Sequence, residues 1–276
     1  MPFQGPEAVG RRYALPVHPM PGGDANRCYA LGDSLVLRVP RDASAAADLA
    51  REAVVIPYAI AAGVPTSSIV EYTGDHMIVT RVPGADAVDV PVSAEFYELV
   101  GEGLAALHTV TSVPGLPADA PDDPLALVNT YAGDGLIDPA TAHWLTAWFE
   151  KLRRPPLPVV LVHGDVAPQN LMVDAGGRFT GFVDWGDARL ADPATDFAKL
   201  PLPSVDQALR GYLGSADLGD WPARVLGHHL HWALGRLASP TPVPAGRHWT
   251  ASPYARLFGI MRFFTAPPEP WAGLLP

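Results

Sequence analysis

The sequence predicts an α+β fold with two lobes, a small β-rich N-terminal lobe over residues 1–82 and a larger, mainly helical C-terminal lobe over residues 83–276. Its 276 residues are enough to bury one large core or two adjoining ones. Before residue 83, short strand-like runs turn at Gly-Asp pairs, whereas beyond it apolar residues recur mostly at helical spacing. This change of pattern, at Pro83-Gly84, predicts the boundary between the lobes.

In the N-terminal lobe, the turns Gly32-Asp33 and Gly74-Asp75 each predict a hairpin between two strands. A glycine-bearing loop, 20–26, precedes the first of these hairpins. An Ala-rich run with apolar residues at helical spacing predicts a helix over 43–62, which ends at Gly63-Val64-Pro65. The predicted strands cover residues 27–31, 34–39, 68–72 and 76–82.

In the C-terminal lobe, helices surround one short strand and one hairpin. Residues 83–86 are interpreted as a linker, and the proline-rich run 154–158 breaks any helix before the strand at 159–162. The hairpin joins 171–173 to 178–183 across a turn that contains two glycines. The predicted helices cover residues 94–108, 139–152, 205–212, 221–238 and 253–264.

The composition excludes several classes of protein. A formal net charge of −10 argues against a nucleic-acid partner, because phosphate backbones need a basic surface. No apolar run reaches the roughly 18 residues of a membrane span, the N-terminal residues lack a signal peptide's apolar core, and Cys28 has no second cysteine to pair with. We therefore expect a cytoplasmic protein. Its acidity either favours a cationic ligand or serves solubility alone.

The residues from Val162 to Asp187 carry the chemistry. A strand delivers Asp165 onto a tight loop, Asn170 follows five residues later, and a hairpin then returns to Asp184. An Asn and an Asp at the end of a hairpin supply the hard oxygen ligands that Mg²⁺ prefers when phosphates complete its shell. Asp165 can accept the proton of an attacking hydroxyl. One base beside two metal ligands is the arrangement of phosphoryl transfer.

This segment resembles the kinase catalytic loop H-x-D-x-x-x-x-N followed by a metal-binding Asp. The variant here, with His163-Gly164-Asp165 and a hairpin before Asp184, is similar to the aminoglycoside phosphotransferase family, and the similarity runs from about residue 22 to residue 199. The resemblance implies a protein-kinase-like fold with the nucleotide between the lobes. His163 is expected to order the loop by hydrogen bonding rather than to transfer protons.

The resemblance also implies roles for residues outside the loop. Arg38 would hold the α/β-phosphates with Glu52 as its acidic partner, and Asp196 would buttress the catalytic loop. The backbone of the hinge would bind the base of the nucleotide through Thr80, Arg81 and Val82. Arg38 stands where protein kinases have Lys, residues 22–26 lack the G-x-G-x-x-G spacing, and no P-loop motif occurs in the sequence.

The implied reaction transfers the γ-phosphoryl group of ATP, with GTP as the alternative donor, to a hydroxyl with the help of Mg²⁺. For an acidic protein, the expected acceptor is a cationic antibiotic, either an aminoglycoside or a basic peptide such as a tuberactinomycin, and phosphorylation would confer resistance. A macrolide, or a small metabolite such as choline, homoserine or a sugar, is the alternative. We expect a monomer or weak dimer with no membrane or nucleic-acid partner.

Two further groups of residues are considered for a role in the site. His228, His229 and His231 form a cluster without a carboxylate or cysteine to complete a metal site, so a half-buried structural or substrate-facing role is expected. Trp185 and Asp187, which flank the metal-binding Asp, are candidates for the wall of the acceptor pocket. We also expect acidic and aromatic residues from the helices after Val205 to line that pocket.

Overall fold

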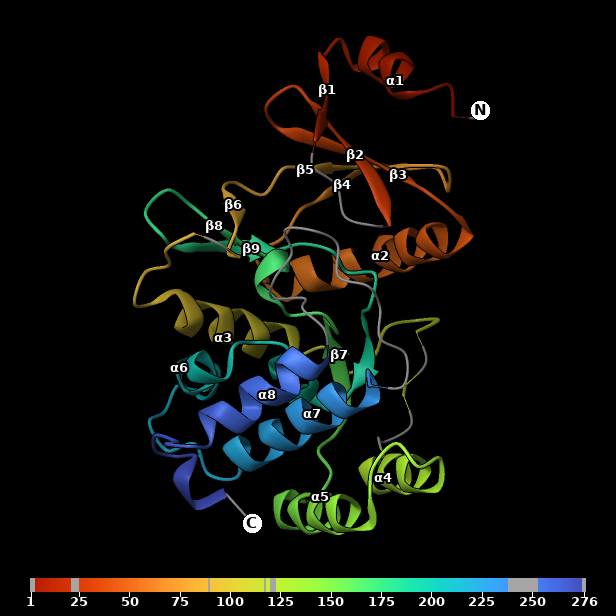
Figure 1. Ribbon diagram of the computed structural model, residues 1–276. Coiled ribbons are helices and arrows are strands. Elements are labelled where there is room, and N and C mark those ends of the chain that lie inside the picture. The colour runs from red at the N-terminus through yellow and green to blue at the C-terminus, as the bar shows by residue number, and fades with distance from the viewer. Residues whose placement is uncertain are drawn as a thin grey trace.

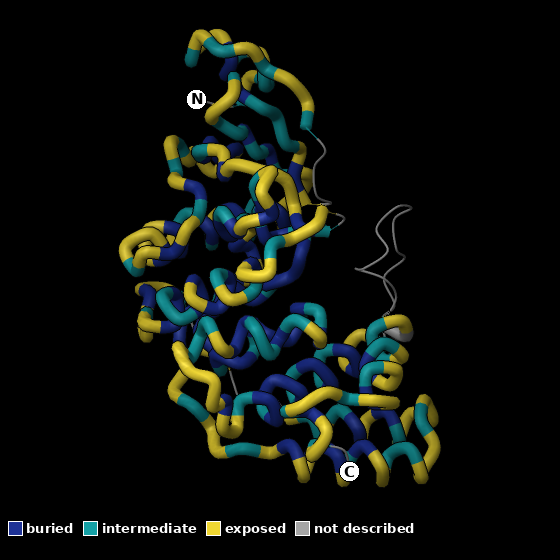
Figure 2. The backbone as a smooth tube through the Cα atoms, turned by 90° about the vertical axis from the view of Figure 1, so that its left-hand side faces the viewer, coloured by how far each residue is buried: buried dark blue, intermediate teal, exposed yellow. Residues whose placement is uncertain are grey.

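The computed structural model describes residues 3–20, 25–88, 90–116, 118–119, 123–237 and 253–274. A β-sheet forms one end of the molecule and helices form the other, with shorter strands between them (Figure 1). Buried positions follow the interior along the length of the molecule (Figure 2). The predicted α+β class, with a sheet-rich N-terminal part and a helical C-terminal part, is confirmed. Among the described helices, none has the length and apolar character required to cross a membrane.

The N-terminal sheet has five antiparallel strands in the order β1-β2-β3-β5-β4. They are β1 (Val17–Met20), β2 (Asn26–Leu31), β3 (Leu35–Pro40), β4 (Ile69–Tyr72) and β5 (Met77–Thr80). Gly32 adopts a φ of 57° in the β2–β3 turn, which glycine does without steric cost, and the resulting register sets Arg38 opposite Cys28. Helix α1 (Pro6–Tyr13) packs on the sheet through Val9, and that cluster contains Leu31, Leu37, Val39 and Ile78.

Helix α2 (Ala43–Ala61) covers the opposite face of the sheet, where Leu49 packs against Met77 and Val79. The helix begins at Asp42, whose carboxylate accepts a hydrogen bond of 2.9 Å from the Ala45 N–H. The buried face of α2 is apolar except for Glu52, which has 0% exposure. A carboxylate so buried requires a partner, and its partner belongs to the candidate site.

Within the described residues, six helices build the C-terminal part around one large apolar core. They are α3 (Phe96–Leu107), α4 (Pro124–Gly133), α5 (Pro139–Leu152), α6 (Leu202–Leu213), α7 (Trp221–Gly235) and α8 (Pro253–Phe263). Helices α3 and α6 cross in backbone contact: a Cβ atom on Gly101 would lie 1.9 Å from the Ala208 oxygen, and one on Gly211 would lie 2.0 Å from the Glu98 oxygen. Both positions therefore need glycine.

Short strands hold the loops of the candidate site between the sheet and the helices. Strand β7 (Val160–Val162) pairs with β10 (Arg189–Ala191), and β6 (Ala85–Asp86), β8 (Leu171–Val173) and β9 (Phe179–Phe182) form a second small sheet. Single-turn helices η1 (Pro168–Asn170) and η2 (Pro193–Phe197) follow β7 and β10, and η3 (Ala272–Leu274) lies near the end of the chain. The segments 163–170 and 183–188 thus both run between the β7–β10 pair and the β8–β9 pair.

The predicted helices and strands are confirmed, with ends that differ by up to three residues. Residues 21–24 of the predicted loop, and the predicted helix end at 238, lie outside the described residues. The interpretation of 83–86 as a linker is wrong: residues 85–86 form β6, because a φ of 107° at Gly84 lets the backbone pass against the Val173 carbonyl and pair with β8. Four further elements of the structure, α1, β1, α4 and β10, were not predicted from the sequence.

Candidate active site

The loop after β7 carries Asp165, the predicted base. Gly164 has a φ of 82°, and a Cβ atom there would lie 2.2 Å from the Asp187 oxygen, so only glycine fits this crossing of two loops. The Asp165 side chain is 22% exposed. Asn170 Nδ2 donates to Asp165 Oδ2 at 2.7 Å and to the Asp165 backbone oxygen at 2.9 Å. Because this amide nitrogen is bound to Asp165, the amide oxygen Oδ1 is the Asn170 atom that can bind a cation.

Asp184 follows the end of β9 and lies close to Asn170 along the backbone. The Val183 N–H donates to the Asn170 carbonyl at 3.0 Å, so the residue before Asp184 is tied directly to Asn170. Asp184 has a φ of 69°, in the left-handed region that Asp tolerates better than most residues, and its side chain is 52% exposed. The structure therefore brings together Asp165, Asn170 and Asp184, the predicted base and the two predicted metal ligands.

Arg38 joins this group to the N-terminal sheet. From β3 it donates to Glu52 on α2, and its other terminal nitrogen lies 3.0 Å from Asp184 Oδ1. Burial alone would lower the pKa of Arg38, but the charges of Glu52 and Asp184 outweigh it and raise that pKa. Burial also raises the pKa of Glu52, against the lowering effect of Arg38. The predicted Arg38–Glu52 pair is present, and it extends to Asp184.

Asp196 supports the catalytic loop from inside the protein. Its carboxylate is 1% exposed and accepts hydrogen bonds from the backbone N–H groups of His163 at 2.8 Å and Gly164 at 2.7 Å. His108 Nε2 lies 3.1 Å from the same carboxylate. Burial alone would raise the pKa of Asp196, but the hydrogen bonds, led by that from His108, hold it below the ordinary value. Asp196 thus has the buttressing contacts that the resemblance implied.

His163 is enclosed under the loop. It is 0% exposed, its Nε2 lies 3.1 Å from the Val183 oxygen, and its ring lies 4.5 Å from that of Trp185. These contacts agree with an ordering role. The interpretation of Trp185 as part of the acceptor pocket is wrong: Trp185 is 0% exposed and donates from Nε1 to Thr66 Oγ1 at 2.9 Å, because its ring fills the core behind the loop. Asp187 is exposed.

The hinge segment at the end of β5 has two backbone donors already in use. The Thr80 N–H donates to the Ser68 oxygen at 2.8 Å, and the Arg81 N–H donates to the Ser34 oxygen at 2.7 Å. Within the described residues, the Val82 N–H makes no such bond. Of the three predicted base-binding residues, Val82 therefore offers the available backbone donor.

Three residues without a predicted role form a group that contacts Asp165 through Lys199. Lys199 Nζ lies 2.6 Å from Asp165 Oδ1. Trp232 on α7 has Arg256 of α8 over its ring at 4.4 Å and Lys199 Nζ at 5.7 Å. Helices α7 and α8 thus place an aromatic ring and a cation next to Lys199, and the expected lining of the acceptor pocket stays a prediction. The sequence does single out Lys199 in one respect, because Lys151 and Lys199 are the only two lysines in the chain.

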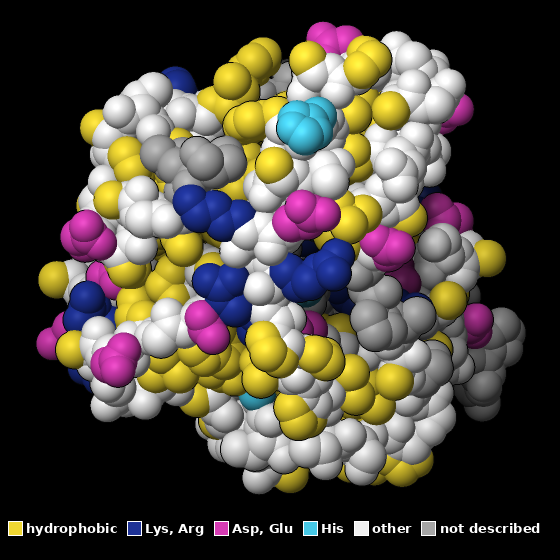
Figure 3. Space-filling view, turned by 90° about the horizontal axis from the view of Figure 1, so that it is seen from below, with side chains coloured by type: hydrophobic (Ala, Val, Ile, Leu, Met, Phe, Trp, Pro, Cys, Tyr) yellow, Lys and Arg dark blue, Asp and Glu magenta, His cyan; other side chains and the backbone are white. Residues whose placement is uncertain are grey.

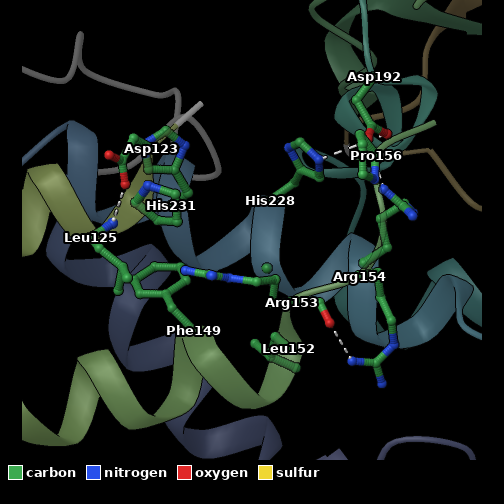
Figure 4. A pocket seen from close by; sticks show the side chains of 13 residues that line it. Asp123, Leu125, Phe149, Leu152, Arg153, Arg154, Pro156, Asp192, His228 and His231 are labelled. Atoms are coloured by element: carbon green, nitrogen blue, oxygen red, sulfur yellow. Dashed lines mark hydrogen bonds and ion pairs between the residues drawn. The ribbon is translucent and has the colours of Figure 1, made fainter. Parts of the chain in front are cut away.

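The three histidines of the predicted cluster are divided between a cavity and the core. His228 and His231 line a cavity of about 330 Å³ whose walls come from α4, α5, α7, the segment 153–156 and Asp192 (Figure 4). His229 is buried instead. Among the described residues, no group of three or more His, Cys, Asp or Glu could hold a metal ion. Seen from below, the surface of the molecule has several Lys and Arg side chains close together near its middle (Figure 3).

Comparison with known proteins identifies the family. Residues 16–225 match the model of the phosphotransferase enzyme family. The chain belongs to this family. It is 30% identical over 173 residues to the aminoglycoside 3'-phosphotransferase of Streptomyces fradiae, and 27% identical over 162 residues to the viomycin phosphotransferase of Streptomyces vinaceus. These matches cover 56% and 53% of this chain but only 64% and 55% of the two relatives.

The phosphotransferase family fold is also found among solved structures. The GDP complex of an aminoglycoside 2'-phosphotransferase-IIIa superposes with a TM-score of 0.66 over 90% of this chain and 91% of that chain. The sequence identity is 17%. This likeness confirms the predicted kinase-like phosphotransferase fold.

Proposed function

We propose that this protein is an ATP- and Mg²⁺-dependent O-phosphotransferase that phosphorylates a hydroxyl of a cationic antibiotic and thereby confers resistance. The observation that carries the proposal is the contact of Asp165 with Asn170, whose backbone oxygen accepts a hydrogen bond from the residue before Asp184. These residues have the chemistry of one base and two oxygen ligands. Because ATP is the phosphoryl donor, the reaction belongs in the cytoplasm.

In this mechanism Asp165 orients the acceptor hydroxyl and takes its proton. The acceptor oxygen forms a bond to the γ-phosphorus, the bond from that phosphorus to the bridging oxygen of ADP breaks, and ADP leaves with the electron pair. Asn170 Oδ1 and the Asp184 carboxylate are hard oxygen donors that fit Mg²⁺. When bound, Mg²⁺ neutralises charge on the phosphates.

The nucleotide is held from the N-terminal side. Arg38, fixed by Glu52, has the charge and the donor geometry to bind the α/β-phosphates. The backbone of Thr80, Arg81 and Val82 binds the base, with the Val82 N–H as donor. Either ATP or GTP fits this arrangement, because a backbone N–H can donate to an acceptor on adenine or on guanine.

The acceptor class is supported by charge and by relatives. The net charge of −10 attracts a cation, and the two named Streptomyces relatives are called aminoglycoside and viomycin phosphotransferases. A second candidate is an acceptor with less positive charge, such as a macrolide or a small metabolite. The cations Lys199 and Arg256 beside the base favour it, because they repel an ammonium group placed next to the reacting hydroxyl.

An ADP-release assay with Mg·ATP tests the proposal against aminoglycosides, tuberactinomycins, macrolides, choline, homoserine and simple sugars. Stimulation by one cationic antibiotic, with a phosphate added to it by mass spectrometry, is the expected result. Turnover only with a macrolide or metabolite would select the second candidate. Turnover with none of these acceptors would contradict both.

The assignment of the base is tested with Asp165→Asn. We expect a fall in kcat of about 10³-fold, because a general base contributes roughly 10²–10⁴-fold, while ATP still binds. The exposed Asp33→Asn, in the β2–β3 turn, is the matched control and should keep full activity. A near wild-type rate for Asp165→Asn would show that Asp165 is not the base.

A further inference from the structure

Lys199 is one residue that neither its local sequence nor the family pattern assigns to the reaction. It lies two residues after η2, and its Nζ atom is 2.6 Å from Asp165 Oδ1. We propose that Lys199 is a second catalytic residue, which holds the Asp165 carboxylate and contacts the phosphoryl group during transfer. This role rests on the proposed function, since it requires that phosphoryl transfer takes place at Asp165.

The geometry brings Lys199 within reach of the reacting atoms. Asn170 binds Asp165 Oδ2 and Lys199 binds Oδ1, so the carboxylate is held at both oxygens. An acceptor oxygen hydrogen-bonded to Asp165 Oδ1 lies within about 6 Å of Lys199 Nζ, and the phosphorus bonds to that same oxygen. An ammonium has three N–H donors, so two remain for phosphoryl oxygens after one binds Asp165. The 17% exposure of the Lys199 side chain, similar to the 22% of Asp165, keeps it open to substrate.

The surroundings of Lys199 hold it in position before any substrate arrives. Arg256 donates to the Lys199 backbone oxygen at 3.1 Å and to the Ala198 oxygen at 3.5 Å. The Trp232 ring lies 4.4 Å from the Arg256 guanidinium and 5.7 Å from Lys199 Nζ. A fixed positive group at the place where negative charge develops stabilises a transition state without having to reorganise.

The choice of residue also fits this role. The chain has 19 Lys and Arg residues, of which only Lys151 and Lys199 are lysine. Lysine carries a compact charge on a flexible stem, whereas the planar arginine fork suits fixed bidentate pairing. In this role the side chain must stay paired with Asp165 and also follow the phosphoryl group from one oxygen to the other. The compact charge and flexible stem of lysine suit this movement better than the planar arginine fork does.

Substitution provides the kinetic test, with a matched control in the other lysine of the chain. We expect Lys199→Met to lower kcat about 10²-fold with little change in acceptor KM, and Lys199→Arg to recover part of the loss. Lys151→Met, at an exposed position of α5, should keep wild-type kinetics. Circular dichroism and thermal melts establish that each variant is folded. A kcat for folded Lys199→Met within about threefold of wild type would overturn the proposal.

A chemical probe tests the same contact without an acceptor. In an acyl-phosphate derivative of ATP, a lysine amine near the γ-phosphate attacks the acyl carbon, a C–N bond forms, and the C–O bond to phosphate breaks to release ATP. We expect mass spectrometry to find the acyl group on Lys199, with excess ATP preventing the reaction, and to find Lys151 unmodified. If ATP binds by calorimetry but Lys199 stays unmodified, the contact with phosphate is wrong. If wild-type protein binds no ATP, the proposed function itself fails.

Discussion

Two buried carboxylates, Asp196 beneath the catalytic loop and Glu52 on α2, are held in different ways. Asp196 accepts from two backbone N–H groups and from His108, and these bonds lower its pKa. Glu52 pairs with one side chain, Arg38, and burial raises its pKa. The hydrogen bonds from the His163 and Gly164 N–H groups to Asp196 hold the backbone of the catalytic loop in place, whatever the conformation of the loop's side chains. The Glu52 pair is instead made of side chains and also reaches the exposed Asp184, so its arrangement can change with a bound ligand.

The largest effect is expected from Asp196→Asn. The amide would turn an NH₂ group toward one of the donors that now bind a carboxylate oxygen, and breaking a buried charged network costs about 3–5 kcal/mol. We expect a loss of that size in the free energy of unfolding by urea, together with a fall in kcat. Asp220→Asn, in a pair with Arg154 that is 70% exposed at Asp220, is the matched control and should cost about 1 kcal/mol or less. Equal losses of unfolding free energy in Asp196→Asn and Asp220→Asn would show that the buried Asp196 contributes no more to stability than an exposed carboxylate does.

Glu52→Gln is expected to lower stability less than Asp196→Asn does, and to weaken nucleotide binding more. Arg38 keeps Asp184 as a partner, so the loss of unfolding free energy should be about 1–3 kcal/mol. The KM for ATP should rise about tenfold, because Arg38 is no longer fixed for the phosphates, while kcat changes less. Glu71→Gln, which removes the partner of Arg12 in the same lobe, is the control and should leave the KM for ATP unchanged. An unchanged KM for ATP in Glu52→Gln would show that the Arg38–Glu52 pair does not contribute to nucleotide binding.

The same comparison explains which parts of the site could be predicted from sequence. Asp165, Asn170 and Asp184 are set by a loop and a hairpin, so their spacing along the chain carries their geometry. The Lys199–Asp165 contact joins residues 34 positions apart and depends on how η2, α7 and α8 pack, which spacing does not encode. Strand β6 was missed because two residues carry no period, and its pairing with β8 depends on a close backbone approach at Gly84.

Helix α4 shows a different limit. Its start is marked by Asp123, whose carboxylate accepts from the Leu125 and Ala126 N–H groups at 3.1 Å, and by Pro124 in the first turn. Only Val128 and Tyr131 are buried, so the helix lacks the wide apolar face that predicts an amphipathic helix. The residues that mark the start of α4, Asp123 and Pro124, therefore predict this helix better than the spacing of its apolar residues does.

The smallest effect is a pH dependence of stability from His229, which supports η2 from the side of α7. Burial lowers the pKa of His229 well below its ordinary value, and the charge of Arg256 adds to this. Below about pH 6.5 the unfolded chain binds a proton that the folded protein excludes, so stability is full above that pH and falls as the pH is lowered. The slope reaches about 1.4 kcal/mol per pH unit once the unfolded histidine is fully protonated.

Urea unfolding between pH 7.5 and 5 measures this slope. His229→Gln should flatten it, because glutamine does not titrate, whereas His143→Gln, at an exposed position of α5, should leave it unchanged. The depressed pKa of Asp196 predicts a separate loss of stability only at pH values below the ordinary carboxylate range, so the two groups act in different pH windows. If the slope persists in His229→Gln, another group with a depressed pKa must titrate between pH 6.5 and 5, and the support of η2 by a neutral His229 would be contradicted.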